Sequence, residues 1–239
     1  MRWIFGLIMG VALGAVVVQP AAAQSTIFNI PTTDTVSPGK YYFEFDYLLQ
    51  LPKPEFDQFS VVAPRVVIGI TPMLEAGVNL GFYHIADGGG TTTIFQPNAK
   101  YKFFSDDDMG LAASAGVIGY IANNDADSFG QIYANVSKKL MSGARIHGGI
   151  YGALSCDCDD TVGVIAGYEQ PLSGRASFVV DLLTGKNFWG YLTPGVSLTL
   201  PRSGLLNIGY SIGWNELTGD GFSDYRNNAL FVYYGITVP

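Results

Sequence analysis

The sequence predicts an all-β protein, and within that class a transmembrane antiparallel up-and-down β-barrel of about 12 strands. Three observations predict this fold: an export signal, a row of apolar-rich segments with alternating side chains, and scarce charges that share one face of those segments. Of 239 residues, 48% are hydrophobic, 14% are charged and 30 are glycine. A disordered chain would be rich in charge and poor in aromatic residues. A nucleic-acid-binding protein would carry a basic face, whereas here 20 acids oppose 13 bases, so we expect no nucleic-acid partner.

Residues 1–23 have the pattern of a secretory signal peptide. Arg2 supplies a positive charge, an uncharged apolar stretch runs from Trp3 to Val18, and small residues at 21–23 offer a cleavage site. The stretch is shorter than the roughly 20 residues of a membrane-spanning helix, so any membrane role falls to strands. We expect an N-terminal extension at 24–39, followed by one barrel domain at 40–239. The extension is open to three arrangements: a lumen plug, a periplasmic tail or a short extra strand.

Apolar-rich segments separated by clusters of turn residues fill the chain from residue 40 onward. Their lengths suit tilted membrane-spanning strands, which need about 9–11 residues, and bacterial single-chain barrels have an even number of strands. The twelve predicted strands are 40–49, 58–70, 73–84, 92–104, 110–121, 128–139, 144–155, 161–170, 176–183, 188–200, 204–214 and 228–238.

The connections alternate in character along the chain. One set is short, at 71–73, 105–109, 140–143, 171–175 and 201–204. The other set is mostly longer or more acidic, at 51–57, 86–91, 122–127, 156–160, 184–187 and 215–227. Outer-membrane barrels have short periplasmic turns and longer outside loops. We therefore expect the protein in the cell outer membrane, in contact with its lipid, with both chain ends on the periplasmic side.

Side chains alternate between bulky apolar and small polar types, as in 204–214, where Ile208 and Ile212 flank Gly209 and Ser211. When the apolar set faces lipid, nearly all strand charges face the lumen. A basic side chain facing lipid at mid-membrane costs about 2–4 kcal/mol, so slipping all strands by one residue is strongly disfavoured. The alternative is a secreted soluble β-sandwich, but the polar face is rich in Gly, Ser, Asn and Tyr rather than in charge.

Twelve side chains are the candidate lumen lining of this barrel. The charges among them complement one another across neighbouring strands, so they either tune ion selectivity or form a salt-bridge network that packs the lumen shut. Two aromatic members either line a solute path or simply pack the lumen. The twelve are Glu44, Asp46, Arg65, Glu75, Lys100, Lys102, Arg145, His147, Glu169, Asp181, Trp189 and Tyr191.

Outward aromatic residues at strand ends predict girdles at the two membrane interfaces. They are Tyr41, Tyr47, Tyr101, Tyr210, Trp214 and Tyr234.

No residue pattern predicts an enzyme or a cofactor site. Cys156 and Cys158 lie on a predicted outside loop, where a disulfide or two thiols are favoured over a metal site, because soft-metal sites usually draw four Cys or His ligands. Some outer-membrane barrels are hydrolases with Ser and His on the lipid face near the outer rim. His84 is expected near that rim, but we expect no serine at the neighbouring strand positions. No nucleophile elbow, phosphate loop or dinucleotide fingerprint occurs.

Two segments carry a resemblance to a known family. VVIGITPMLEAGVNLGF (66–82), with its Gly-Ile-Thr turn and an acid opening the next strand, and QPNAKYKFF (96–104), with a lysine in a strand before an acidic turn, resemble consecutive hairpins of the MetA-pathway phenol-degradation family of outer-membrane channels. The resemblance implies transport of hydrophobic or aromatic compounds, and it supplies no catalytic residues.

These observations predict a porin-like channel for passive or facilitated passage of small solutes, hydrophobic or aromatic ones included. The alternatives are a closed barrel with a structural or partner-docking role and a salt-bridged lumen, and a rim hydrolase. A homo-oligomer or an outer-membrane partner stays open.

Overall fold

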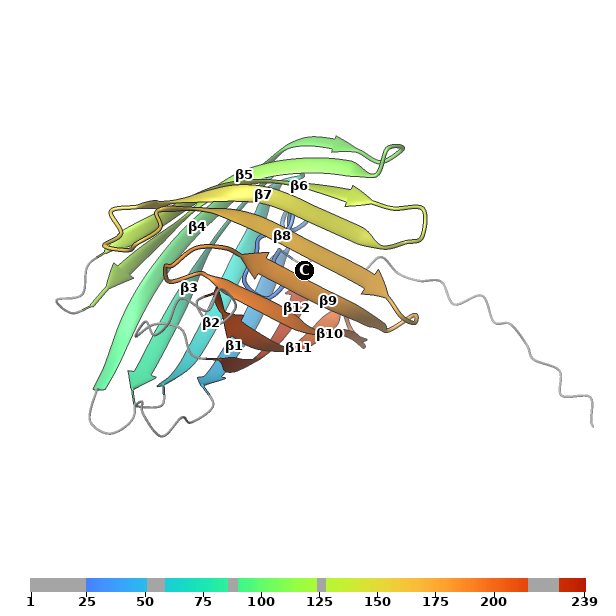
Figure 1. Ribbon diagram of the computed structural model, residues 1–239. Coiled ribbons are helices and arrows are strands. Elements are labelled where there is room, and N and C mark those ends of the chain that lie inside the picture. The colour runs from blue at the N-terminus through green and yellow to red at the C-terminus, as the bar shows by residue number, and fades with distance from the viewer. Residues whose placement is uncertain (1–24, 51–58, 86–89, 124–127, 215–227) are drawn as a thin grey trace, which may run out of the picture.

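The chain forms a closed β-barrel in the computed structural model (Figure 1). The structure describes residues 25–50, 59–85, 90–123, 128–214 and 228–239, so the predicted signal peptide and most of the predicted longer loops lie outside the described residues. Within these ranges, no helix is long and apolar enough to cross a membrane. The strands are β1 (Tyr41–Gln50), β2 (Phe59–Thr71), β3 (Leu74–Ile85), β4 (Gly90–Asp106), β5 (Leu111–Ala122), β6 (Phe129–Lys139), β7 (Arg145–Leu154), β8 (Val162–Pro171), β9 (Ala176–Leu183), β10 (Tyr191–Leu200), β11 (Gly204–Gly213) and β12 (Ala229–Val238).

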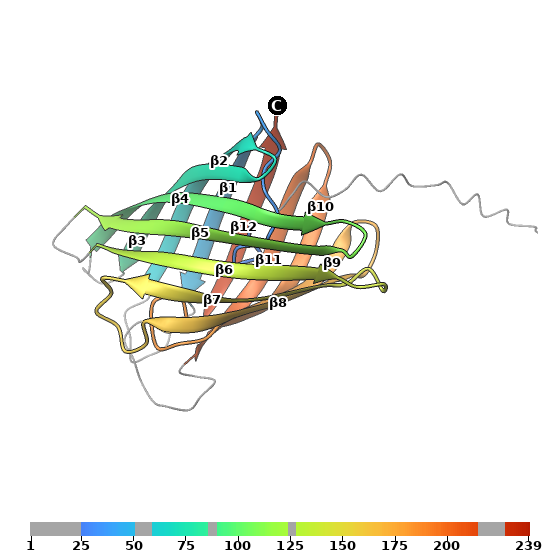
Figure 2. The same ribbon diagram turned by 90° about the horizontal axis from the view of Figure 1, so that it is seen from above.

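Each strand pairs antiparallel with the next, and β1 pairs with β12 from Tyr41↔Val238 to Gln50↔Ala229. The up-and-down order is visible in two views (Figures 1 and 2). The predicted barrel of twelve strands is confirmed. We call the end that carries the connections 72–73, 107–110, 140–144, 172–175 and 201–203 the turn end, and the opposite end the loop end.

Two strands differ most from the predicted ranges. β4 runs from Gly90 to Asp106 and is longer than the predicted 92–104. β10 begins at Tyr191 instead of 188, because the three residues before it leave the wall and turn into the barrel. The connection predicted at 184–187 is longer in the structure, at 184–190, and Asn187 within it is buried, with only 3% of its surface exposed.

The outer surface of the barrel is apolar, whereas the lumen side carries the buried polar and charged side chains together with a cluster of large apolar and aromatic ones. β6 shows the alternation: Ile132 and Val136 are exposed, whereas Gln131, Asn135 and Ser137 are buried. A surface of this kind is typical of a membrane-spanning barrel, because large contiguous apolar patches are rare on soluble proteins. Of the predicted girdle residues, Tyr41, Tyr47, Tyr101 and Tyr234 are exposed, and Tyr210 and Trp214 are half-buried.

Residues 25–36 lie inside the barrel, as the blue coil of Figures 1 and 2 shows, and the exposed residues 37–39 lead from there to β1; we call residues 25–39 the plug. Ile27, Ile30 and Thr33 are fully buried. A parallel bridge between Pro38 and Gly69 connects the end of the plug to β2. Of the three arrangements open for this segment, the structure has the lumen plug.

The lipid-facing role of the exterior predicts a depth-dependent cost for a buried charge. Ile150 lies on the outer face in the middle of β7 and is 61% exposed, and Leu154 lies on the same face at the loop end. We expect Ile150→Arg to lower the free energy of unfolding in phospholipid vesicles by about 2–4 kcal/mol, and the matched control Leu154→Arg by about 0–1 kcal/mol. Urea titration measures both, and equal effects would contradict a membrane centre at Ile150.

Candidate functional site

The plug begins with a tight hairpin turn inside the lumen. The Ile27 N–H donates to the Ile30 carbonyl at 3.0 Å, and the Thr32 N–H donates to the Ser25 carbonyl at 3.0 Å. Phe28 and Asn29 therefore occupy the two central positions of the turn. Asn suits such a position because its short side chain tolerates turn conformations. The turn thus aims an aromatic ring and an amide side chain at the wall.

Asp181 of β9 receives this turn. Its Oδ2 accepts the backbone N–H groups of Asn29 at 2.5 Å and of Ile30 at 3.0 Å. The Asn29 side chain donates from Nδ2 to Thr193 Oγ1 at 2.8 Å, and Thr193 lies opposite Asp181 on β10. Asp181 is fully buried. One wall carboxylate therefore fixes the backbone of the turn.

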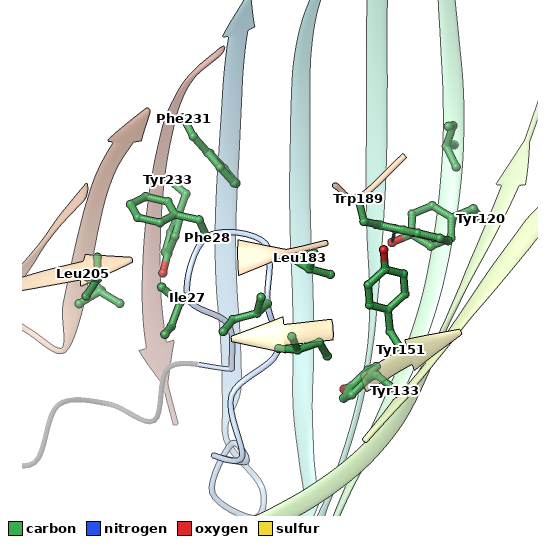
Figure 3. Close-up of a cluster of buried hydrophobic side chains, with 14 residues drawn as sticks. Ile27, Phe28, Tyr120, Tyr133, Tyr151, Leu183, Trp189, Leu205, Phe231 and Tyr233 are labelled. Carbon is green, nitrogen blue, oxygen red and sulfur yellow. Dashed lines mark hydrogen bonds between the residues drawn. The ribbon is translucent and has the colours of Figure 1, made fainter. Parts of the chain in front are cut away.

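The Phe28 ring fits a socket in the wall formed by β10, β11 and β12. It lies 5.5 Å from the Phe231 ring and 6.0 Å from the Tyr233 ring, centroid to centroid (Figure 3). Gly195 and Gly209 form the floor: a Cβ at either position would come within 2.4 or 2.5 Å of Phe28 Cζ. Only glycine leaves room for the ring at these two positions.

A buried ion pair holds the two ends of the plug. Lys100 Nζ lies 3.0 Å from Glu75 Oε1, with both side chains about 3% exposed. Lys100 also donates to the Ser25 carbonyl at 3.1 Å, and the Val36 N–H donates to Glu75 Oε2 at 2.7 Å. Removing one partner of a buried ion pair typically costs about 3–5 kcal/mol, because the other charge is left buried. The pair therefore joins β3 to β4 in the wall and also binds Ser25 and Val36 of the plug.

Arg145 holds the middle of the plug. Its guanidinium donates to both carboxylate oxygens of Asp34, at 2.5 and 3.0 Å, and to Thr33 Oγ1 at 2.8 Å. Glu169 lies 3.8 Å from Arg145 and 2.7 Å from His147 Nε2. Burial alone would raise the pKa of the Asp34 carboxyl, but the Arg145 guanidinium more than offsets this and holds the pKa below its ordinary value. Asp34 is thus a carboxylate at neutral pH.

A third group of charges lies between β1 and β2. Arg65 Nη1 is 3.0 Å from Glu44 Oε1 and also donates to Thr26 Oγ1 of the plug at 3.2 Å. Asp46 is the next lumen-facing residue along β1, and its buried Oδ1 has no hydrogen-bond partner among the residues the structure describes. Lys102 is half-buried toward the turn end of β4, beside the register shift between 102 and 104.

A second aromatic group lies in the lumen at the loop end, and we call it the aromatic cap: Tyr120, Phe129, Tyr151, Phe188 and Trp189. The Trp189 indole N–H donates to Tyr120 Oη at 2.8 Å, and its ring lies 5.6 Å from that of Tyr151 (Figure 3). Tyr191 is also buried, at 9% exposure. Trp189 therefore packs against other aromatic rings in the lumen.

The loop between β7 and β8 is hydrogen-bonded to the β9–β10 connection, which carries Phe188 and Trp189 of the aromatic cap. The Lys186 N–H donates to Asp160 Oδ2 at 2.7 Å, and Asn187 Nδ2 donates to the Asp160 carbonyl at 2.9 Å. In the same loop Cys156 and Cys158 are joined by a disulfide, one of the two states favoured by the sequence. Within the described residues, no group of three or more His, Cys, Asp or Glu side chains could hold a metal ion.

The expectation that no serine neighbours His84 is wrong. Ser60 of β2 lies directly opposite His84 of β3, and Nδ1 of His84 is 3.1 Å from Thr91 Oγ1. The register shift between Gly69 and Thr71 sets this pairing, and a one-residue bulge of this kind is not encoded in strand periodicity.

The alternation of side chains correctly predicts that the wall charges face the lumen, but it does not predict which plug residues they contact. Ser25, Phe28, Asn29 and Asp34 are all in contact with the wall. Residues 25–39 have no periodicity, so no pattern assigns them to a face.

Comparison with known proteins gives no family. No family model matches the chain, and no curated protein matches it, so the resemblance to the MetA-pathway family stays a prediction. One similar solved structure comes from work on in-meso crystallization of membrane proteins, with 12% identity, a TM-score of 0.44, and 82% of this chain and 83% of that chain covered. Another is the translocator domain of autotransporter NalP from Neisseria meningitidis, with 14% identity, a TM-score of 0.44, and 82% and 87% covered.

The lowered pKa of Asp34 predicts a pH-dependent contribution to stability. A depressed carboxyl pKa stabilises the fold above the ordinary value of about 3.9, and this contribution is lost as the pH falls through the folded pKa. We expect Asp34→Asn to lower the free energy of unfolding by about 1 kcal/mol at pH 7, and the difference from wild type to shrink below about pH 4. Urea titration at several pH values measures it. Asp107→Asn, in an exposed turn, is the control, and a pH-independent difference for Asp34→Asn would contradict the role of its charge.

Proposed function

We propose that this protein is an outer-membrane channel for passive or facilitated passage of small solutes, and that the plug and the aromatic cap close its lumen. The observation that carries the proposal is how the plug is held. The hydrogen bonds named above between residues 25–36 and the wall all involve a side chain. A segment bonded in this way can leave its place without breaking any strand pairing of the barrel.

The chain is proposed to sit in the outer membrane with its turn end toward the periplasm. The apolar outer surface matches lipid on all sides, and short periplasmic turns are the rule in such barrels. The predicted signal peptide would export the chain, and membrane lipid is the partner that this surface fits.

The strand number also favours passage over a solid core. Barrels of eight strands are just filled by their own side chains, whereas larger barrels enclose space. Here a wall of small residues such as Gly167, Gly195 and Gly209 leaves room that the plug then occupies. The resemblance to the MetA-pathway family adds hydrophobic or aromatic compounds as the proposed solutes.

The second candidate is a closed barrel with a structural or docking role. The buried pair Glu75–Lys100 and the pair Glu44–Arg65 favour it, because both pack charge inside the lumen. The two functions differ in one observable: a channel conducts when its plug is removed, and a structural barrel whose side chains fill the lumen does not.

Deletion of residues 25–39 tests the proposal. We expect the purified variant to conduct at least about tenfold more than wild type in planar bilayers, because an emptied barrel of this strand number is wider than its side chains can fill. Trp189→Ala, which removes the largest ring of the cap, serves as the companion variant, and we expect it to raise the conductance of the deletion variant further. A folded deletion variant without conductance or solute flux would contradict the channel and support the structural role.

We also propose that no hydrolysis accompanies passage. Ser60 and His84 are neighbours on the lipid face near the loop end, so they are the pair to test. We expect Ser60→Ala and His84→Ala to leave the background rate of lipid and ester hydrolysis by the purified protein unchanged. Activity above that background in wild type, abolished by both substitutions, would make the protein a rim hydrolase.

A further inference from the structure

The socket that holds Phe28 and its turn has two parts, and its residues come from four consecutive strands, β9 to β12. One part is the space for a phenyl ring over the paired glycines Gly195 and Gly209, with Phe231 and Tyr233 against the ring. The other part is the buried carboxylate of Asp181. The wall residues belong to the barrel, and their present occupant belongs to the plug, so displacement of the plug would vacate the site.

The carboxylate of Asp181 is short of positive charge. Its Oδ2 accepts two backbone N–H groups, while its buried Oδ1 has no hydrogen-bond partner among the described residues. Within the same residues, the ion pairs of the lumen join other carboxylates and leave Asp181 out. A buried charge is stable only when it is paired or hydrogen-bonded. The site therefore favours an occupant that brings N–H donors, and most of all one that brings a cation.

The hydroxyl groups of Thr193 and Ser211, next to Asp181, also favour an occupant with N–H donors. Thr193 Oγ1 lies 2.9 Å from Ser211 Oγ and accepts from the Asn29 side chain at 2.8 Å. These hydroxyl oxygens can accept a further N–H beside the carboxylate. An ammonium group has three donors and no acceptor, which matches Asp181 and Thr193 together.

We propose that this socket is a solute-binding site of the channel, that it takes arylalkylammonium ions (a phenyl ring joined by a short chain to a protonated amine), and that Phe28-Asn29-Ile30 is its internal occupant. The ring replaces Phe28 and the ammonium donates to Asp181 Oδ1, which accepts no hydrogen bond from the described residues; when the turn moves away, the ammonium also takes the place of the two backbone N–H groups on Oδ2. Aromatic carboxylates are disfavoured, because they would place like charge beside Asp181. The proposal rests on the channel function, since a solute reaches the socket only when the plug moves.

Because the plug is covalently linked to the barrel, a free solute must compete with Phe28 for the socket. A covalently linked occupant acts at an effective concentration that is on the order of mM for short linkers. Wild type should therefore bind a free arylalkylammonium weakly. Removal of the Phe28 ring should free the slot and leave the barrel wall intact.

Binding of 2-phenylethylammonium to full-length Phe28→Ala in detergent tests the site. We expect this variant to bind it at least about tenfold more tightly than wild type, and at least about tenfold more tightly than phenylacetate, by isothermal titration calorimetry. Adding Asp181→Asn should remove the preference for the ammonium over phenylacetate. Adding Gly209→Ala should abolish binding of both, because its Cβ would take the place of the ring.

The matched control is Phe178→Ala, which removes a ring from the outer face and should leave binding as in wild type. Heat-modifiable migration on gels verifies that each variant is folded, and Phe28→Val is the milder substitute if Phe28→Ala does not fold. Equal affinity of folded Phe28→Ala for the ammonium and for phenylacetate, or no gain over wild type, would overturn the site. Conductance of the plug-deleted protein is a separate readout: its presence without binding refutes the site alone, and its absence refutes the channel.

Discussion

Closure of the sheet between β1 and β12 is the constraint on which the rest of the molecule depends. In lipid an unpaired backbone N–H or C=O costs several kcal/mol, so a sheet can span a membrane only when it has no free edge. The ten pairs from Tyr41↔Val238 to Gln50↔Ala229 remove that edge. Closure divides every strand into a lipid-facing and a lumen-facing set, and this division determines where each charge in the wall lies.

Closure also creates an interior that the wall does not fill. The wall supplies glycines, polar residues, a few charges and aromatic rings to the lumen, and the plug supplies one ring for the glycine floor, N–H groups for Asp181 and Glu75, and a carboxylate for Arg145. The plug and the wall are thus complementary in shape and in charge. Complementarity of this kind stabilises the closed state, and it is the basis of the proposal that a solute with similar chemistry competes with the plug.

The strand positions and their two faces could be predicted from the sequence, because the alternation is a local property of each strand. Ile132 and Val136 against Gln131 and Asn135 identify both faces of β6 without any knowledge of its neighbours. The partners inside the lumen could not be predicted in the same way. Asp34 reaches Arg145 across 111 positions of sequence, and Asn29 reaches Asp181 across 152, so these contacts depend on the closed barrel as a whole. The pairing of Ser60 with His84 depends on a one-residue bulge, which periodicity does not reveal.

The central claim is that the plug must move for solutes to pass, and a reversible tether tests it most directly. Ile30 Cδ1 lies 2.5 Å from the position that a Cβ on Gly167 would take, so the two residues are neighbours and cysteines at these positions can be joined by a short, reducible bis-methanethiosulfonate cross-linker. In a Cys156→Ser, Cys158→Ser background, we expect cross-linked Ile30→Cys/Gly167→Cys protein to show no solute flux into vesicles, and the reduced protein to regain the flux of the parent. Equal flux before and after reduction, with the cross-link verified by mass spectrometry, would contradict the claim.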